Sequence, residues 1–212
     1  MRRIALSLLA AVAIAPVVST PAHPQAPGGH LPVGIWAGVT SATIRGSDAT
    51  GPTDIAGFSA GVFTQWRLAP HWALQPEVQY TQKGSDEVAM TNGGTVYSMH
   101  IRLSYVEVPV LLRVEGSPLG PLTPFAVLGP EVAFKTGCGL VLTGLPGDFS
   151  CASLPPAESV DYGGIGGAGV AFRLAGRTYG LSARYDVGLA NAFKDNNARN
   201  RALTILLGTV FR

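Results

Sequence analysis

Apolar and polar residues alternate one by one through much of this chain, most regularly between positions 55 and 68. Because successive side chains of a β-strand point to opposite faces, this alternation predicts a strand with one apolar and one polar face. The apolar row is Ala56, Phe58, Ala60, Val62, Trp66 and Leu68, and the polar row is Gly57, Ser59, Gly61, Gln65 and Arg67. A soluble barrel turns its apolar row inward, whereas a transmembrane barrel turns it outward to lipid.

Eight segments of this kind are joined by connections that alternate between short and long. The predicted strands are residues 31–41, 55–68, 71–84, 100–115, 121–135, 161–174, 177–188 and 202–211. The connections 69–70, 116–120 and 175–176 are short and contain Pro or Gly, which predicts tight turns. The connections 42–54, 85–97, 136–160 and 189–201 are long and polar. Since outer-membrane barrels sort their loops in this way, we predict an all-β, eight-stranded antiparallel up-and-down transmembrane β-barrel.

The composition indicates that the outer surface of the protein contacts lipid rather than water. Only 13% of the residues are charged and 47% are hydrophobic, whereas soluble domains carry about 25% charged residues. The apolar rows are therefore expected to face lipid, with an aromatic girdle near the periplasmic strand ends made by Trp66, Trp72, Tyr179 and Phe211. The alternative is a soluble periplasmic or secreted barrel that binds a hydrophobic ligand, which requires an apolar interior. The net charge of +2 is too small to indicate a surface that binds nucleic acid.

The N-terminal residues indicate export. Arg2 and Arg3 precede an apolar run over residues 4–18, and Thr20-Pro21-Ala22 offers a small-x-small cleavage site. We predict a signal peptide over residues 1–22, a leader over residues 23–30 and one outer membrane β-barrel domain over residues 31–212. The expected location is the cell outer membrane, with outer membrane lipid as a partner.

Four segments make the chain resemble the PorT-like family of outer membrane β-barrel proteins. They are LQPEVQYTQKG at 74–84, SYVEVPVLLRV at 104–114, PFAVLGPEVAF at 124–134 and ARYDVGLANAF at 183–193. The resemblance implies a small eight-stranded barrel that the outer-membrane assembly machinery inserts, and for most members no assigned activity. It carries over no functional residue. The chain departs from the usual aromatic C-terminus of such barrels, because Arg212 follows Phe211.

The inward row is expected to hold a network of charges. An eight-stranded barrel has a lumen that side chains can fill, and buried carboxylates need cations beside them. A register that places Glu77 opposite Glu107 would bring two like charges together, and Arg184 is then expected to reach between them with its bidentate guanidinium. The predicted lumen ion network consists of three acids and three bases, Arg67, Glu77, Glu107, Arg113, Glu131 and Arg184.

Two cysteines stand in one predicted outer loop, at Cys138 and Cys151. In an exported protein this arrangement predicts a disulfide, which closes a loop of about a dozen residues and stabilises the fold by about 3 kcal/mol in the chain-entropy model. A metal site is the rival interpretation. It would need further ligands, and the loop supplies only Asp148 and Glu158, so we expect no metal.

We predict no enzymatic activity, no cofactor and no catalytic residue, and a structural or surface-interaction role through four long extracellular loops. A secretion complex or an extracellular ligand is the class of partner that these loops leave open. Two weaker alternatives are a narrow pore and a lipid-modifying enzyme that uses His100 with Ser98 or Ser104. A third weaker alternative is a glycosidase-like enzyme in which Glu77 and Glu107 act as general acid and base. A filled lumen, however, offers no cleft for a substrate.

Overall fold

The structure is a computed structural model, and it describes residues 31–45, 54–92, 95–143, 159–189 and 199–211. Within these residues no helix is long and apolar enough to cross a bilayer. The strands are β1 (Val33–Arg45), β2 (Ile55–Thr64), β3 (Trp66–Ala69), β4 (Trp72–Asn92), β5 (Thr95–Glu115), β6 (Leu122–Thr143), β7 (Val160–Leu174), β8 (Arg177–Gly188) and β9 (Arg199–Phe211).

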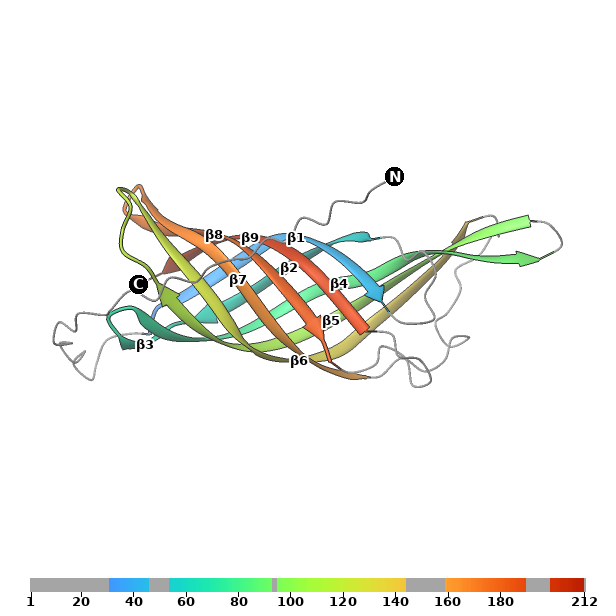
Figure 1. The fold of residues 1–212 in the computed structure, drawn as a ribbon, viewed down its shortest axis with the longest axis horizontal. Coiled ribbons are helices and arrows are strands. Elements are labelled where there is room, and N and C mark those ends of the chain that lie inside the picture. Colours follow the sequence, from blue (N-terminus) through green and yellow to red (C-terminus); the bar gives the residue numbers. More distant parts are fainter. Residues whose placement is uncertain (1–30, 46–53, 93–94, 144–158, 190–198, 212) are drawn as a thin grey trace, which may run out of the picture.

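These strands close into one antiparallel barrel (Figure 1). Strands that follow one another in the chain pair with each other, except β2 and β3, and β1 also pairs with β9. β2 and β3 are two parts of one barrel strand, interrupted at Gln65, and both pair with β4. The nine hydrogen-bonded segments therefore make eight barrel strands, which confirms the predicted fold class.

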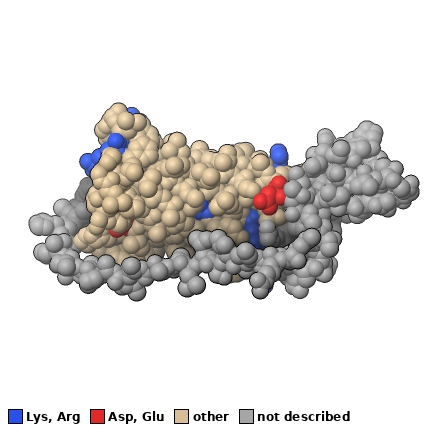
Figure 2. Space-filling view, turned by 45° about the horizontal axis from the view of Figure 1, so that its top comes forward, with Lys and Arg blue, Asp and Glu red and all other residues tan. Residues whose placement is uncertain are grey.

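The apolar rows lie on the outer face of the barrel. Val39 is 64% exposed and Leu207 is 54% exposed, whereas Gln75 and Glu107 on the inner face are almost fully buried. Figure 2 shows that the middle of one outer face is mainly uncharged, with most charged atoms near its two ends. The apolar rows thus point away from the lumen, as predicted, and the alternative of an apolar ligand chamber has the wrong polarity.

The three tight turns lie at one end of the barrel, which we call the short-turn end; the opposite end is the long-loop end. Trp66, Trp72 and Phe211 are each between 41% and 45% exposed near the short-turn end. The turn at Ala175 and Gly176 joins β7 to β8, and both residues have positive φ, at 49° and 76°. Two positive φ values in a two-residue hairpin turn are those of a type I′ turn, whose twist matches the flanking strands.

One predicted long loop is wrong. Residues 85–97 are mostly strand, because β4 runs to Asn92 and β5 begins at Thr95. β6 also continues to Thr143, where it pairs with Ser98 of β5. The three strands extend beyond the rest of the barrel (Figure 1). The segment's polar composition resembles a loop, but Asn92-Gly93 between β-branched residues is a hairpin turn signal.

Small residues on the inner face leave room for large ones. A Cβ atom on Gly208 would lie 2.0 Å from Cε3 of Trp36, and one on Gly169 would lie 2.5 Å from Cζ of Phe125. Trp36 in turn stacks on Phe63, with 4.5 Å between the ring centroids. The apolar part of the lumen is filled by these rings and by Leu111, Val127, Ile165 and Leu206.

Candidate functional site

The lumen holds the buried charges, and one pair of them spans it. Glu77 on β4 and Arg184 on β8 stand four strands apart in either direction around the barrel. Nη1 of Arg184 donates to Oε2 of Glu77 over 2.7 Å, and Nη2 donates to Oε1 over 3.1 Å. This bidentate geometry is the strongest arrangement of a guanidinium and a carboxylate. It ties two opposite walls of the barrel together.

The layer around this pair continues across the lumen. Gln65 donates to Gln75 over 2.8 Å, and Gln75 donates to Glu77 over 2.5 Å. The guanidinium carbon of Arg184 lies 5.0 Å from the ring centroid of Trp36, which stacks on Phe63. Side chains from β1, β2, β4 and β8 thus meet in one continuous layer that fills this level of the barrel.

Two further arginines, Arg113 and Arg67, lie nearer the short-turn end. Arg113 is buried, with its guanidinium carbon 3.5 Å from the ring centroid of Phe125, and its Nε donates to Glu115 over 3.1 Å. Arg67 also binds Glu115, over 3.1 Å, and donates to the carbonyl of Pro70. The side chain of Arg67 is 44% exposed. Arg67 is therefore part of the rim, and its predicted place inside the lumen is wrong.

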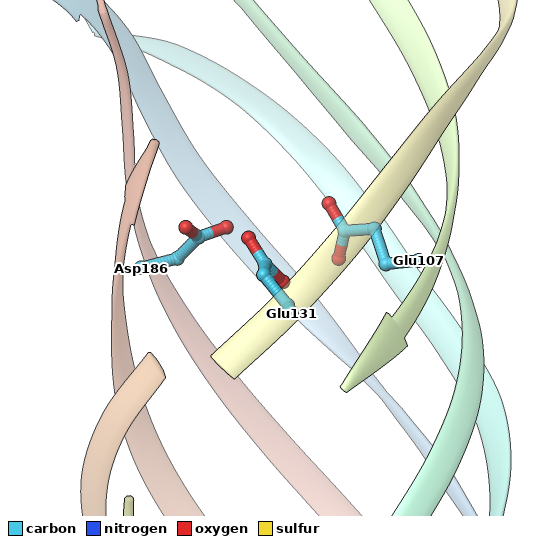
Figure 3. A group of neighbouring side chains, drawn as sticks. All are labelled: Glu107, Glu131 and Asp186. Carbon is cyan, nitrogen blue, oxygen red and sulfur yellow. The ribbon is translucent and has the colours of Figure 1, made fainter. Parts of the chain in front are cut away.

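Toward the long-loop end, three carboxylates from three strands converge on one lysine. Glu107 of β5, Glu131 of β6 and Asp186 of β8 point toward one another (Figure 3), with ligand atoms within 4.8 Å. Nζ of Lys83 lies 2.7 Å from Oε1 of Glu107 and 3.7 Å from Oε1 of Glu131, and it forms an ion pair with Asp186. We call these four residues the Lys83 cluster.

Neutral donors add hydrogen bonds around the Lys83 cluster. Gln79 and Thr81 donate to Oε2 of Glu107 over 2.8 and 2.9 Å. Asn200 donates to Asp161 over 3.0 Å and to the hydroxyl of Tyr105 over 3.3 Å. Among the described residues the lumen buries five carboxylates, Glu77, Glu107, Glu131, Asp161 and Asp186, against three cations, Lys83, Arg113 and Arg184.

This arrangement is suited to holding the barrel wall rather than to chemistry on a substrate. Carboxylate oxygens in such a group are the ligands that hard cations prefer, but the ammonium of Lys83 already stands among the three carboxylates. Breaking a buried ion pair by removing one partner costs about 3 to 5 kcal/mol. The network is thus a plug whose members depend on one another.

The sequence prediction of the network was incomplete in its members, and the register that it considered for Glu77 and Glu107 is not the one observed. The structure brings Glu77 to Arg184 and Glu107 to Glu131, but Gln79 pairs with Glu107 across β4 and β5. Glu77 and Glu107 are therefore not opposite each other, and Arg184 contacts only the first of them. Lys83 and Asp186 were missed, although both share the inward parity of their strands. Their position in the inward-facing row of each strand was the signal in the sequence that could have identified them.

The remaining candidates lie partly outside what the structure describes. Cys138 is near the end of β6, and Cys151 falls outside the described residues, so the disulfide stays a prediction. The side chains of His100 and Ser98 are likewise outside the described part. Ser104 is described, and its hydroxyl accepts a hydrogen bond of 2.8 Å from Tyr80.

Comparison with known proteins finds the same architecture in outer membrane β-barrels. The family model described as an outer membrane protein β-barrel domain matches residues 25–194, and no curated protein matches. Neisserial surface protein A is similar in structure, with a TM-score of 0.51 and 14% identity over 84% of this chain and 97% of that one. OprG of Pseudomonas aeruginosa has a TM-score of 0.48 and 14% identity, covering 86% and 96%. Ail of Yersinia pestis, solved with a heparin analogue, has a TM-score of 0.46 and 11% identity, covering 86% and 100%.

Proposed function

Because the chain belongs to the outer membrane protein β-barrel domain family, we propose that it is a non-enzymatic barrel with a plugged lumen that acts at the cell surface. The location in the outer membrane follows from the family, and the short-turn end is then periplasmic and the long-loop end extracellular. The surface role is the finer part of the proposal. It assigns the working surface to the extracellular strands and loops rather than to the lumen.

The observation that carries the proposal is the filled layer at Glu77 and Arg184. The bidentate pair joins opposite walls, and the ring of Trp36 lies against the guanidinium on one side. An eight-stranded barrel has room for side chains but not for a water channel as well. A lumen closed in this way supports neither a solute path nor a substrate cleft, so the outer ends of the strands are the parts free to act.

The extension of β4, β5 and β6 is the proposed platform for surface contacts. The β4 strand pairs with β5 between Gly84 and Asn92, a span of nine residues with a register shift between Val88 and Thr91, and this span is about 26 Å of strand from end to end. On its other side β4 pairs with β2 only between Glu77 and Thr81. A hairpin of this length carries its tip well away from the lipid headgroups, where it can meet an extracellular ligand or a secretion complex.

Several finer assignments accompany this proposal. The signal peptide over residues 1–22 and the membership of the PorT-like branch rest on the sequence segments alone. We further propose that the outer-membrane assembly machinery inserts the barrel. In this proposal the machinery recognises the glycine and the aromatic residue of the last strand, Gly208 and Phe211, although Arg212 follows them. The absence of catalysis is proposed on the plugged lumen and on the use of the Ser104 hydroxyl by Tyr80.

The test joins two measurements on the purified full mature chain. In planar lipid bilayers the protein should give no steady ion conductance, because the Glu77–Arg184 layer closes the lumen. On intact cells, the Thr91→Cys variant should react with a membrane-impermeant maleimide at its new cysteine, whereas the Arg177→Cys variant, changed beside the periplasmic turn of β7 and β8, should not react there. A stable conductance in bilayers would instead show a pore, and labelling only at position 177 would reverse the orientation.

A further inference from the structure

The outer row of β9 changes from apolar to basic toward its extracellular end. Leu207, Ile205 and Leu203 are 48 to 54% exposed and face the lipid. The next two positions of the same row are Arg201 and Arg199, and both are exposed. Because the row is continuous, these two guanidinium groups project from the same face of the wall that contacts lipid.

The arginines of this row have no acidic partner among the residues that the structure describes. Across the β1–β9 pairing, Arg45 stands opposite Arg199, so two basic residues share one register position. Like charges directly opposite each other on one sheet face destabilise the sheet. The carboxylate of Asp54, beyond β1, instead accepts a hydrogen bond of 3.2 Å from Ser41. The patch formed by Arg199 and Arg201 thus carries positive charge that an anion would offset.

The level of the patch matches the headgroups of the outer leaflet. Tyr185 of β8 pairs with Leu203 and is 45% exposed, and tyrosines on the outer face mark the membrane interface. Arg201 and Arg199 lie two and four residues beyond this level, about 7 and 13 Å along the strand. With the usual barrel tilt this is about 5 Å along the membrane normal for the Cα atom of Arg201 and about 10 Å for that of Arg199. The polar region of each leaflet is about 5 to 8 Å thick, so Arg201 lies within this region and Arg199 just beyond its outer edge.

We propose that the patch of Arg199 and Arg201 binds the phosphate groups of the glycolipid that forms the outer leaflet. The guanidinium group donates two parallel hydrogen bonds to phosphate oxygens, which gives both affinity and orientation. The acyl chains of the same lipid would then lie along Leu203, Ile205 and Leu207. Continuity with the lipid-facing row selects a membrane lipid over a soluble anion. The inference rests on the barrel, its location and the proposed orientation with the long-loop end outside, and it is independent of the proposed surface role.

The experiment uses the full mature chain in a neutral detergent and compares three probes. They are bisphosphorylated lipid A, the same lipid A after enzymatic removal of its phosphates, and inorganic phosphate. Binding is measured by native mass spectrometry and by the rise in the heat-unfolding temperature on addition of each probe. The test variant is Arg199→Gln with Arg201→Gln. The matched control is Arg173→Gln with Arg177→Gln, which changes two exposed arginines at the periplasmic turn of β7 and β8.

We expect bisphosphorylated lipid A to bind the parent and the control variant, and to bind the test variant at least tenfold more weakly, which is about 1.4 kcal/mol. Folding of the test variant is checked by its unchanged heat-dependent gel shift without lipid. If dephosphorylated lipid A binds as well, or if the control loses the same affinity, the phosphate site is refuted. Saturable binding of inorganic phosphate alone with equal loss in the test variant would show an anion site and overturn the assignment to lipid.

Discussion

Arg184 of β8 reaches across the lumen to Glu77 of β4 and joins it through two hydrogen bonds of 2.7 and 3.1 Å. The two residues are 107 positions apart in the chain and on opposite walls of the barrel. Their carboxylate and guanidinium are both almost fully buried. The barrel is therefore held by contacts through its lumen as well as by the hydrogen bonds of its wall.

Arg184→Ala is expected to lower the resistance of the barrel to heat unfolding in detergent. The change leaves the carboxylate of Glu77 buried without its cation, at a cost of about 3 to 5 kcal/mol. The temperature at which the unboiled, fast-migrating gel band disappears measures this effect. Arg173→Ala, at an exposed position of β7, serves as the control. An unfolding temperature equal to that of the parent would contradict the role of the pair.

Lys83→Met is expected to destabilise the extracellular half of the lumen. The methionine keeps the apolar stem but removes the ammonium from among Glu107, Glu131 and Asp186, so that like charges are left facing one another. The expected loss is again about 3 to 5 kcal/mol, measured by denaturant unfolding in detergent. Adding Glu107→Gln to Lys83→Met should restore part of the loss, because one negative charge is removed. No recovery in the double variant would speak against an electrostatic origin.

Gly208→Ala is expected to impair folding because the new methyl group has no space. Its Cβ would lie 2.0 Å from Cε3 of Trp36 and 2.6 Å from the carbonyl oxygen of Ile35. Overpacking of this kind costs about 1 to 3 kcal/mol. Gly166→Ala is the matched control, since its nearest contact would be Cδ1 of Leu128 at 3.7 Å. Equal yields of folded barrel from both variants would show that the lumen can adapt.

The turn between β7 and β8 allows a prediction in the opposite direction. Ala175 has a φ of 49°, and an alanine in this region costs about 1 to 2 kcal/mol. Ala175→Asn should therefore raise the unfolding temperature, because asparagine tolerates positive φ and is favoured in type I′ turns. Gly176→Ala places a methyl group on a residue with a φ of 76° and should lower it. The reverse order of the two variants would be incompatible with this turn.

The disulfide between Cys138 and Cys151 can be tested by mass alone. Alkylation of the unfolded chain without reductant should add no mass, whereas alkylation after reduction should label both thiols. Closing this loop stabilises the fold by about 3 kcal/mol in the chain-entropy model, so reduction should also lower the unfolding temperature. Two labelled thiols in unreduced protein would exclude the bond.

The fold class and the location could be predicted because they depend on a local pattern. The period of two along each strand fixes which residues share a face, so the lipid-facing row of β9 and the inward place of Glu77 were readable from the sequence. The ends of the strands were not. Residues 85–97 have a polar composition, and only their pairing with a neighbouring strand distinguishes a long hairpin from a loop.

What the amino-acid sequence by itself determined is the wall of the barrel: its eight strands, their two faces and the short turns between them. What only the tertiary structure decided is which inward residues meet. Lys83 with its three carboxylates, Arg184 with Glu77, and Arg67 at the rim instead of the lumen all depend on the register of every strand pair between them. Parity is a property of each strand alone, whereas a contact across the lumen depends on strand tilt and stagger around the closed barrel.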